Sequence, residues 1–193
     1  MILFQARALS LIYLALFGAW LLGEVLLLVR RRANRGVVQA DRGFVGRALL
    51  VLLVSNFAAI LALKFFRPMT FATDVSASAG LCLMAVGLML RWWSVIHLGR
   101  FFTVNVAVAA DQHVVESGPY RWIRHPAYAG MLLVVTGIGV CFGNVVSMLV
   151  ILIPMLLLVV KRMRIEEEAL ANSLGDAYRG YMARTKRLFP AIY

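Results

Sequence analysis

The sequence predicts an all-α integral membrane protein with about five transmembrane helices. Of the 193 residues, 62% are hydrophobic and only 15% are charged, and the mean hydropathy is +0.84. About a quarter of the residues are charged in a typical soluble domain, so this composition excludes that class. The apolar runs are also long enough for membrane helices, because about 20 helical residues cross the hydrocarbon core of a bilayer.

Five apolar runs are the expected membrane helices. They cover residues 8–29, 48–63, 78–98, 127–142 and 145–160. The last two are short for a full span and flank Gly143-Asn144, a pair of residues typical of turns, so we expect a tight helical hairpin. The first run is too long for a cleavable signal peptide and lacks a small-residue cleavage site after it. We therefore expect it to remain as a helix.

The basic residues predict the orientation of the chain. Most of the 20 Lys and Arg residues follow the first, third or fifth run, whereas Arg7, Lys64 and Arg67 lie at the opposite ends. Lys and Arg accumulate on the cytoplasmic side of membrane helices, so we expect the N-terminus outside and the C-terminus in the cytoplasm. This bias, with attraction to anionic membrane lipids, accounts for the net charge of +11. The basic residues do not gather on one soluble face, so nucleic-acid binding is not predicted.

Two ionisable residues, Glu24 and Arg91, lie within the first and third runs. Ionisable residues inside membrane helices are candidates for function by default. Both are expected at a similar depth in the cytoplasmic half of the membrane. We favour a buried ion pair that joins the two helices over a role in substrate binding.

The cysteines and histidines do not form a metal-binding pattern. Cys82 and Cys141 are expected near the outer ends of the third and fourth runs, and we interpret them as buried small residues rather than a disulfide. His97, His113 and His125 form no pair spaced four residues apart and no cluster with cysteine. The sequence therefore predicts no metal site.

Two polar blocks, residues 99–126 and 161–193, are expected on the same side of the membrane. The first leads into GPYRWIRHPAYAG, where Pro126 suits the first turn of a helix and places His125 at the helix start. Free N–H groups at that end would suit a carboxylate or another anion. The alternative is a simple anchor, with Arg121 and Arg124 on lipid headgroups and Trp122 and Tyr128 in the aromatic belt.

The second block begins with KRMRIEEEAL, directly after the fifth run. Arg162 and Glu166 are four residues apart and so share one face of a helix. Glu166 to Glu168 provide three carboxylates close to the membrane surface. They fit either a solvated helix with weak ion pairs or a pocket that holds a cation. Gly175-Asp176 is expected to end this helix and start another.

These motifs occur in a specific order: LGRFFT, HVVESGPYRWIRHPAYAG, the apolar hairpin, RMRIEEEAL and LGDAYRGYMARTKRLFP. This order resembles the isoprenylcysteine carboxyl methyltransferase family and its phospholipid methyltransferase relatives. The resemblance covers residues 98–190, and the first two runs match only as generic membrane helices. The apolar runs predict three N-terminal transmembrane helices in residues 1–98. The resemblance implies a catalytic methyltransferase region in residues 99–193, with a small cytoplasmic subdomain that binds a cofactor.

The resemblance also implies a methyl donor, S-adenosylmethionine, and a lipophilic acceptor that enters from the bilayer through a tunnel. Carried over position by position, it implies donor contacts at Gln112, His113, Val114, Val115, Tyr120, His125, Pro126, Ala127, Tyr128 and Glu166. Arg162 matches the arginine that binds the acceptor, so Arg162 and Glu166 are the expected catalytic residues. Membrane lipids are expected around the helices, and neither nucleic acid nor a metal is an expected partner.

The expected reaction is direct displacement, in which an acceptor oxygen attacks the methyl group of the donor. A carboxylate is already nucleophilic at neutral pH, so catalysis depends on positioning and desolvation. We therefore expect O-methylation of a carboxylate on a lipid-like or isoprenylated acceptor. The alternatives are a phospholipid or amine N-methyltransferase, a dinucleotide-dependent membrane reductase of related architecture, and a lipid-binding protein without enzymatic activity.

Overall fold

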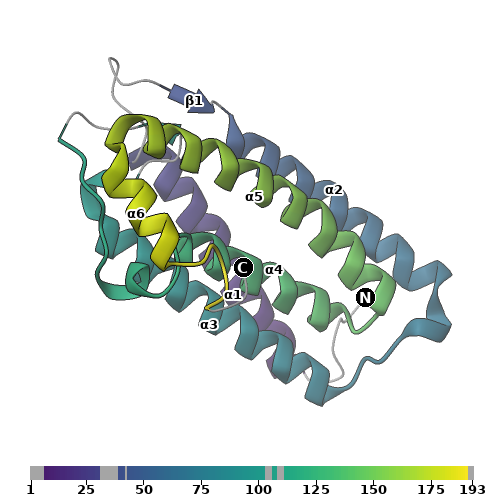
Figure 1. The fold of residues 1–193 in the computed structure, drawn as a ribbon. Helices are drawn as coiled ribbons and strands as arrows, with labels where there is room; N and C mark the ends of the chain where they lie inside the picture. The colour runs from purple at the N-terminus through teal and green to yellow at the C-terminus, as the bar shows by residue number, and fades with distance from the viewer. Residues whose placement is uncertain (1–6, 31–38, 42, 103–105, 108–110, 191–193) are drawn as a thin grey trace.

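The computed structural model describes residues 7–30, 39–41, 43–102, 106–107 and 111–190. Long helices dominate these residues and form an elongated bundle, with the short helix α6 at one end (Figure 1). The helices are α1 (Arg7–Arg30), α2 (Phe44–Phe65), α3 (Asp74–Leu98), α4 (Pro126–Phe142), α5 (Val145–Leu174) and α6 (Asp176–Arg184). This arrangement confirms the predicted all-α class.

The apolar runs correspond to the first five helices. By length and composition, α1, α2, α3 and α5 can each cross a membrane, and α4 is a shorter apolar helix of 17 residues. Large apolar side chains cover the outside of the bundle, as Leu14, Leu53 and Phe57 illustrate with exposed fractions of 61%, 64% and 64%. Such a surface is unfavourable in water and suits lipid. The protein is therefore an integral, multi-pass membrane protein.

Helix α5 is longer than the run that predicted it. The apolar run ends at Val160, but the helix continues without a break to Leu174. Gly175, with a φ of 58°, ends it, and α6 begins at the next residue, as predicted. No Gly or Pro interrupts residues 161–174, and Lys, Arg, Glu and Ala favour helix. The acidic block is thus a rigid extension of a membrane helix.

The shorter elements lie between the helices. A two-stranded antiparallel sheet pairs β1 (Gln39–Asp41) with β2 (Val106–Ala107). The 3₁₀ helix η1 (Arg67–Met69) follows α2, and η2 (Gly99–Phe101) follows α3. A further 3₁₀ helix, η3 (Gly118–Arg121), precedes α4. Strand β1 lies at the same end of the bundle as α6 (Figure 1). The polar elements are therefore gathered at that end.

The predicted hairpin between α4 and α5 is confirmed. Gly143 ends α4 with a φ of 61°, and a Cβ there would lie 2.6 Å from the Cα of Ala72. Asn144 is fully buried, and its Oδ1 accepts a hydrogen bond of 3.0 Å from the N–H of Ser147, which caps α5. Its Nδ2 donates to the carbonyl of Phe66 at 2.8 Å. The hairpin is therefore fixed to the end of α2.

Glycines bring α3 and α4 into close contact, and this is the most extensive helix pair in the bundle. A Cβ on Gly87 would lie 2.6 Å from the carbonyl oxygen of Gly130, and one on Gly137 would lie 2.5 Å from that of Gly80. Small residues let membrane helices approach closely and gain van der Waals contact. Cys141, which is buried and free, lies against the same interface, whereas Cys82 is exposed and free. The start of α4 is thereby held against α3.

Candidate functional site

A cavity of about 1070 Å³ lies among the polar elements and the neighbouring ends of the long helices. Side chains from both polar blocks reach it, and so do residues of α1, α2 and α3. The wall thus combines elements that are far apart in the sequence. A cavity with both polar and aromatic walls is typical of a site for a small molecule.

Most of the residues that the family resemblance predicted to contact a ligand line this cavity. They are Gln112, His113, Val114, Val115, Tyr120, His125, Ala127, Tyr128, Arg162 and Glu166. Pro126 is the exception, because it is fully buried at the first position of α4 and does not reach the wall. The structure therefore brings the predicted residues together, and what they bind stays a prediction.

The hydroxyl of Tyr128 bridges Arg162 and Glu166. It donates a hydrogen bond of 2.8 Å to Oε2 of Glu166 and accepts one of 3.2 Å from Nε of Arg162. Arg162 is only 2% exposed, and its guanidinium carbon lies 4.8 Å from the centre of the Phe44 ring. A cation and a carboxylate one helical turn apart are therefore held on the same wall.

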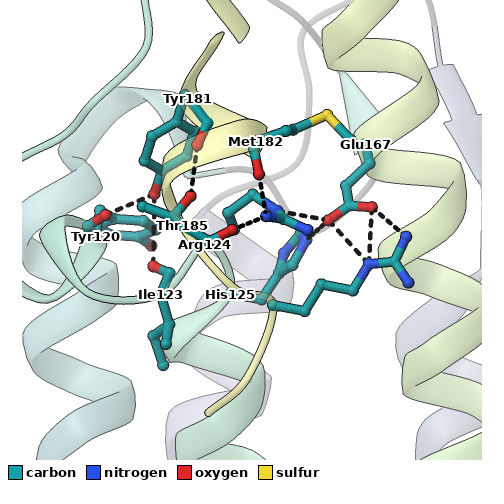
Figure 2. A network of polar contacts seen from close by, with 9 residues as sticks. Tyr120, Ile123, Arg124, His125, Glu167, Tyr181, Met182 and Thr185 are labelled. Atoms are coloured by element: carbon teal, nitrogen blue, oxygen red, sulfur yellow. Dashed lines mark hydrogen bonds and ion pairs between the residues drawn. The ribbon is translucent and has the colours of Figure 1, made fainter. Parts of the chain in front are cut away.

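Glu167, rather than its neighbours, joins the two polar blocks. Its Oε1 accepts a hydrogen bond of 2.9 Å from Nε of Arg124 and lies 3.2 Å from Nε2 of His125 (Figure 2). Its Oε2 accepts one of 2.7 Å from Nη2 of Arg187. Glu167 is 3% exposed, and a buried carboxylate requires such charged partners. This residue was missing from the predicted site.

The sequence did contain a signal for the burial of Glu167. The buried positions of α5 recur every four residues, at Ile151, Met155, Val159, Met163 and Glu167. Successive residues of this series lie about one turn apart, so they form a continuous strip that winds slowly around the helix. Glu167 therefore continues the strip that packs inside the bundle, whereas Glu168 points away and is exposed.

The C-terminal segment closes over the start of α4. The hydroxyl of Tyr181 donates a hydrogen bond of 2.6 Å to the carbonyl of Tyr120 (Figure 2). Burial raises the pKa of Tyr181 to about 12, so its phenol stays protonated and able to donate. Arg124 donates to the carbonyls of Met182, at 3.0 Å, and Thr185. Helix α6 is thus fixed against η3.

The predicted anion site at the start of α4 is wrong in its detail. The N–H groups of Arg124 and His125 donate to the carbonyls of Lys186 and Arg187, at 2.8 and 3.0 Å. The N–H of Tyr128 donates to the carbonyl of His125 at 3.1 Å. The C-terminal segment therefore occupies the N–H groups of Arg124 and His125, and the N–H of Tyr128 is used within the start of the helix. Glu167 supplies the carboxylate beside His125.

The predicted pairing of Glu24 with Arg91 is confirmed, and both residues line the cavity. The indole N–H of Trp20 donates to Oε1 of Glu24 at 3.0 Å. Nη1 of Arg91 also donates to the carbonyl of Ala127 at 3.1 Å. The pair therefore links α1 and α3 to the first turn of α4, at the wall of the cavity.

The segment from Asp111 to Ser117 covers the cavity and is held by exposed contacts. Asp111 and Glu116 pair with Arg100 and Arg184, each at 2.8 Å. Further contacts join His113 to Phe101, as an edge-on ring pair with centroids 5.0 Å apart, and Ser117 to His97 at 2.8 Å. Exposed ion pairs are weak, so this cover is fixed less firmly than the wall beneath it.

A second, largely apolar cavity of about 340 Å³ adjoins the first. Phe44 and Glu24 line both cavities. The other lining residues come from α1, α2, α4 and α5: Trp20, Leu21, Ala48, Leu49, Leu52, Met131 and Met155. The larger cavity, with its mixed polar and apolar lining, and the smaller apolar one therefore meet at Glu24 and Phe44.

A family model and individual relatives both relate this chain to the same family. The model of the isoprenylcysteine carboxyl methyltransferase (ICMT) family matches residues 80–172. Protein-S-isoprenylcysteine O-methyltransferase B of Arabidopsis thaliana is 28% identical over 145 residues, which are 74% of this chain and 73% of that protein. Protein-S-isoprenylcysteine O-methyltransferase of Schizosaccharomyces pombe is 28% identical over 124 residues. That match covers 63% of this chain and 52% of the yeast protein.

A solved structure shares the fold over almost the whole chain. The eukaryotic intramembrane Ras methyltransferase ICMT superposes with a TM-score of 0.73 at 20% identity. The superposition covers 99% of this chain and 70% of that one. The N-terminal helices, which the sequence matched only as generic spans, therefore belong to the shared fold. The family model over residues 80–172 and the named relatives therefore show that this chain is similar to the isoprenylcysteine carboxyl methyltransferase family, and the solved structure shows that it shares the fold.

Proposed function

We propose that this protein is an S-adenosylmethionine-dependent membrane methyltransferase that O-methylates a carboxylate on a lipid-like or isoprenylated acceptor. One observation carries the proposal: Tyr128 holds the cation of Arg162 and the carboxylate of Glu166 on one wall of a cavity in a membrane protein. The two relatives described above are named as isoprenylcysteine O-methyltransferases, which supports the same reaction class.

The residues of the larger cavity fit the proposed methyl donor. Its wall combines charged, aromatic and apolar side chains, as a nucleoside with an amino-acid tail requires. Glu166 offers negative charge for the donor's ammonium and sulfonium groups, and apolar side chains such as Leu98, Phe102 and Leu170 can enclose an adenine ring. When bound, S-adenosylmethionine supplies a methyl group activated by the adjacent positive sulfur.

Arg162 is the proposed binding group for the acceptor. A guanidinium binds a carboxylate through charge-assisted, often bidentate hydrogen bonds, and it repels a protonated amine. The apolar cavity beyond Phe44 suits the hydrocarbon chain of the same acceptor. Because a carboxylate needs no general base at neutral pH, the protein's contribution is to orient the acceptor and exclude water. This arrangement favours O-methylation over N-methylation.

The proposed orientation places the cavity on the cytoplasmic side. Arg100, Arg121 and Lys161 belong to the polar segments at the cavity end of the bundle, where basic residues concentrate. Lys64, in the last turn of α2, and Arg67, in η1, lie at the hairpin end. The excess of basic residues supports a cytoplasmic cavity by the positive-inside rule. A donor made in the cytoplasm would then reach the site directly.

Labelled methyl transfer tests the proposal. The purified protein is incubated with isotopically labelled S-adenosylmethionine and, in separate reactions, an N-acetylated farnesylcysteine and phosphatidylethanolamine. We expect base-labile methyl ester on the farnesylcysteine and no label on the amine. Calorimetry should show binding of S-adenosylhomocysteine and none of NADPH. Label on the phospholipid would favour N-methylation, and NADPH binding without S-adenosylhomocysteine binding would favour a reductase.

A further inference from the structure

Phe44 is a buried aromatic residue that was not among the predicted site residues. It is the first residue of α2, after Gly43, whose φ of 83° turns the chain into the helix. It is 6% exposed and lies outside residues 80–172, the region that matches the family model. Its position at the junction of the two cavities calls for an explanation.

The ring of Phe44 packs on the group proposed to bind the acceptor. The guanidinium carbon of Arg162 lies 4.8 Å from the ring centroid, within the range of a cation–π interaction. The same ring meets Tyr128 edge-on, with centroids 6.1 Å apart and planes at 72°. Tyr128 in turn accepts the hydrogen bond from Nε of Arg162. Phe44 therefore contacts Arg162 directly and also contacts its hydrogen-bond partner.

A cation–π contact holds the guanidinium carbon over the ring. The N–H donors of a guanidinium lie at its edge, where they can form hydrogen bonds. Bidentate binding of a carboxylate requires two parallel N–H groups. A side chain that holds the guanidinium in position before the acceptor arrives reduces the loss of conformational entropy on binding.

We infer that Phe44 is a positioning residue for the acceptor, an inference that rests on the proposed function. It holds the Arg162 guanidinium in position to receive the acceptor's carboxylate. It also lies at the boundary where the carboxylate-bearing group, beside Arg162 in the larger cavity, would meet the apolar chain in the second cavity. Phe44 acts through Arg162 and takes no part in the bond changes.

Kinetics of the full-length protein test this role. Phe44→Leu keeps an apolar side chain and removes the ring, whereas Phe44→Tyr keeps the ring. Phe57→Leu is the matched control, because Phe57 lies on the same helix, is 64% exposed and is absent from both cavities. The acceptor is N-acetylated farnesylcysteine, and calorimetry with S-adenosylhomocysteine reports the donor site separately.

We expect Phe44→Leu to raise the KM for the acceptor by about 5- to 30-fold, as expected for a desolvated cation–π contact, with S-adenosylhomocysteine affinity changed by less than about twofold. Phe44→Tyr should recover most of the loss, and Phe57→Leu should match the wild type. Phe44→Leu should have little further effect in an Arg162→Lys background, since it acts through Arg162. If Phe44→Leu does not fold, Phe44→Met provides the same comparison.

Other outcomes overturn the inference. Unchanged acceptor KM in Phe44→Leu or Phe44→Met, equal losses of donor and acceptor affinity, or full additivity with Arg162→Lys would each show that Phe44 does not position Arg162. If the wild-type protein neither binds S-adenosylhomocysteine nor methylates the acceptor, the proposed function fails, and the role of Phe44 fails with it. The wild-type measurement therefore separates the two failures.

Discussion

Arg91 of α3 and Glu24 of α1 form a two-point ion pair inside the bundle. Nε of Arg91 lies 2.5 Å from Oε1 of Glu24, and Nη2 lies 2.6 Å from Oε2. Both side chains are nearly inaccessible, with exposed fractions of 8% and 10%. A charge-assisted pair of this geometry satisfies groups that would be very costly to bury alone. It also places two charges beside the cavity without exposing them to lipid.

Removing one partner of this pair should destabilise the protein more than removing both. Glu24→Gln or Arg91→Met should each cost about 3 to 5 kcal/mol, because an uncompensated buried charge or polar group remains. The double variant should recover part of that loss. Thermal unfolding of the four proteins in the same detergent measures the coupling. Purely additive losses would mean that the two side chains do not depend on one another.

Glu167→Gln should destabilise the polar end of the bundle. The change removes the charge that compensates Arg124 and Arg187 and leaves both cations buried or partly buried. We expect a loss of about 3 to 5 kcal/mol and, because His125 loses its partner, weaker S-adenosylhomocysteine binding as well. Glu168→Gln is the matched control, since Glu168 is the exposed neighbour. Equal unfolding temperatures for the two variants would contradict the role assigned to Glu167.

The close packing of α3 and α4 gives a third prediction. Gly87→Ala would place a Cβ 2.6 Å from the Gly130 carbonyl oxygen, so the helices must separate. Overpacking of this kind costs about 1 to 3 kcal/mol. Gly46→Ala in α2 meets nothing within 4 Å and should be neutral or slightly stabilising. Thermal unfolding compares the two, and a Gly87→Ala protein as stable as Gly46→Ala would show that the interface can relax.

The sequence predicted the helices well because hydropathy and helix propensity are local properties. It predicted the convergence of Arg162, Glu166 and Tyr128 only through resemblance to a family, since contacts across the bundle depend on the fold. Glu167 was missed because the burial of a carboxylate depends on partners that are distant in sequence, such as Arg124, 43 residues away. The paired N–H groups of Arg124 and His125 were missed for the same reason, because their acceptors lie in the C-terminal segment.

Arg162 and Glu166, one turn apart on the cavity face of α5, should affect different steps: Glu166 the binding of the donor, and Arg162 the binding of the acceptor. Glu166→Gln removes the negative charge proposed for the donor and should raise the dissociation constant of S-adenosylmethionine. Arg162→Ala should leave that constant nearly unchanged and reduce methyl transfer. A lost charge-assisted contact of about 1.5 to 3 kcal/mol corresponds to about 10- to 100-fold in either quantity.

Tyr128→Phe provides the control for this division, because it removes the bridge between the two residues and keeps both charges. It should produce a smaller effect on each quantity than the loss of the charged group itself, since the carboxylate of Glu166 and the guanidinium of Arg162 both remain. On the same preparations, calorimetry measures the dissociation constant of the donor, and labelled-methyl turnover measures the rate of methyl transfer. Normal donor binding by Glu166→Gln, or normal turnover by Arg162→Ala, would show instead that these residues only stabilise the bundle.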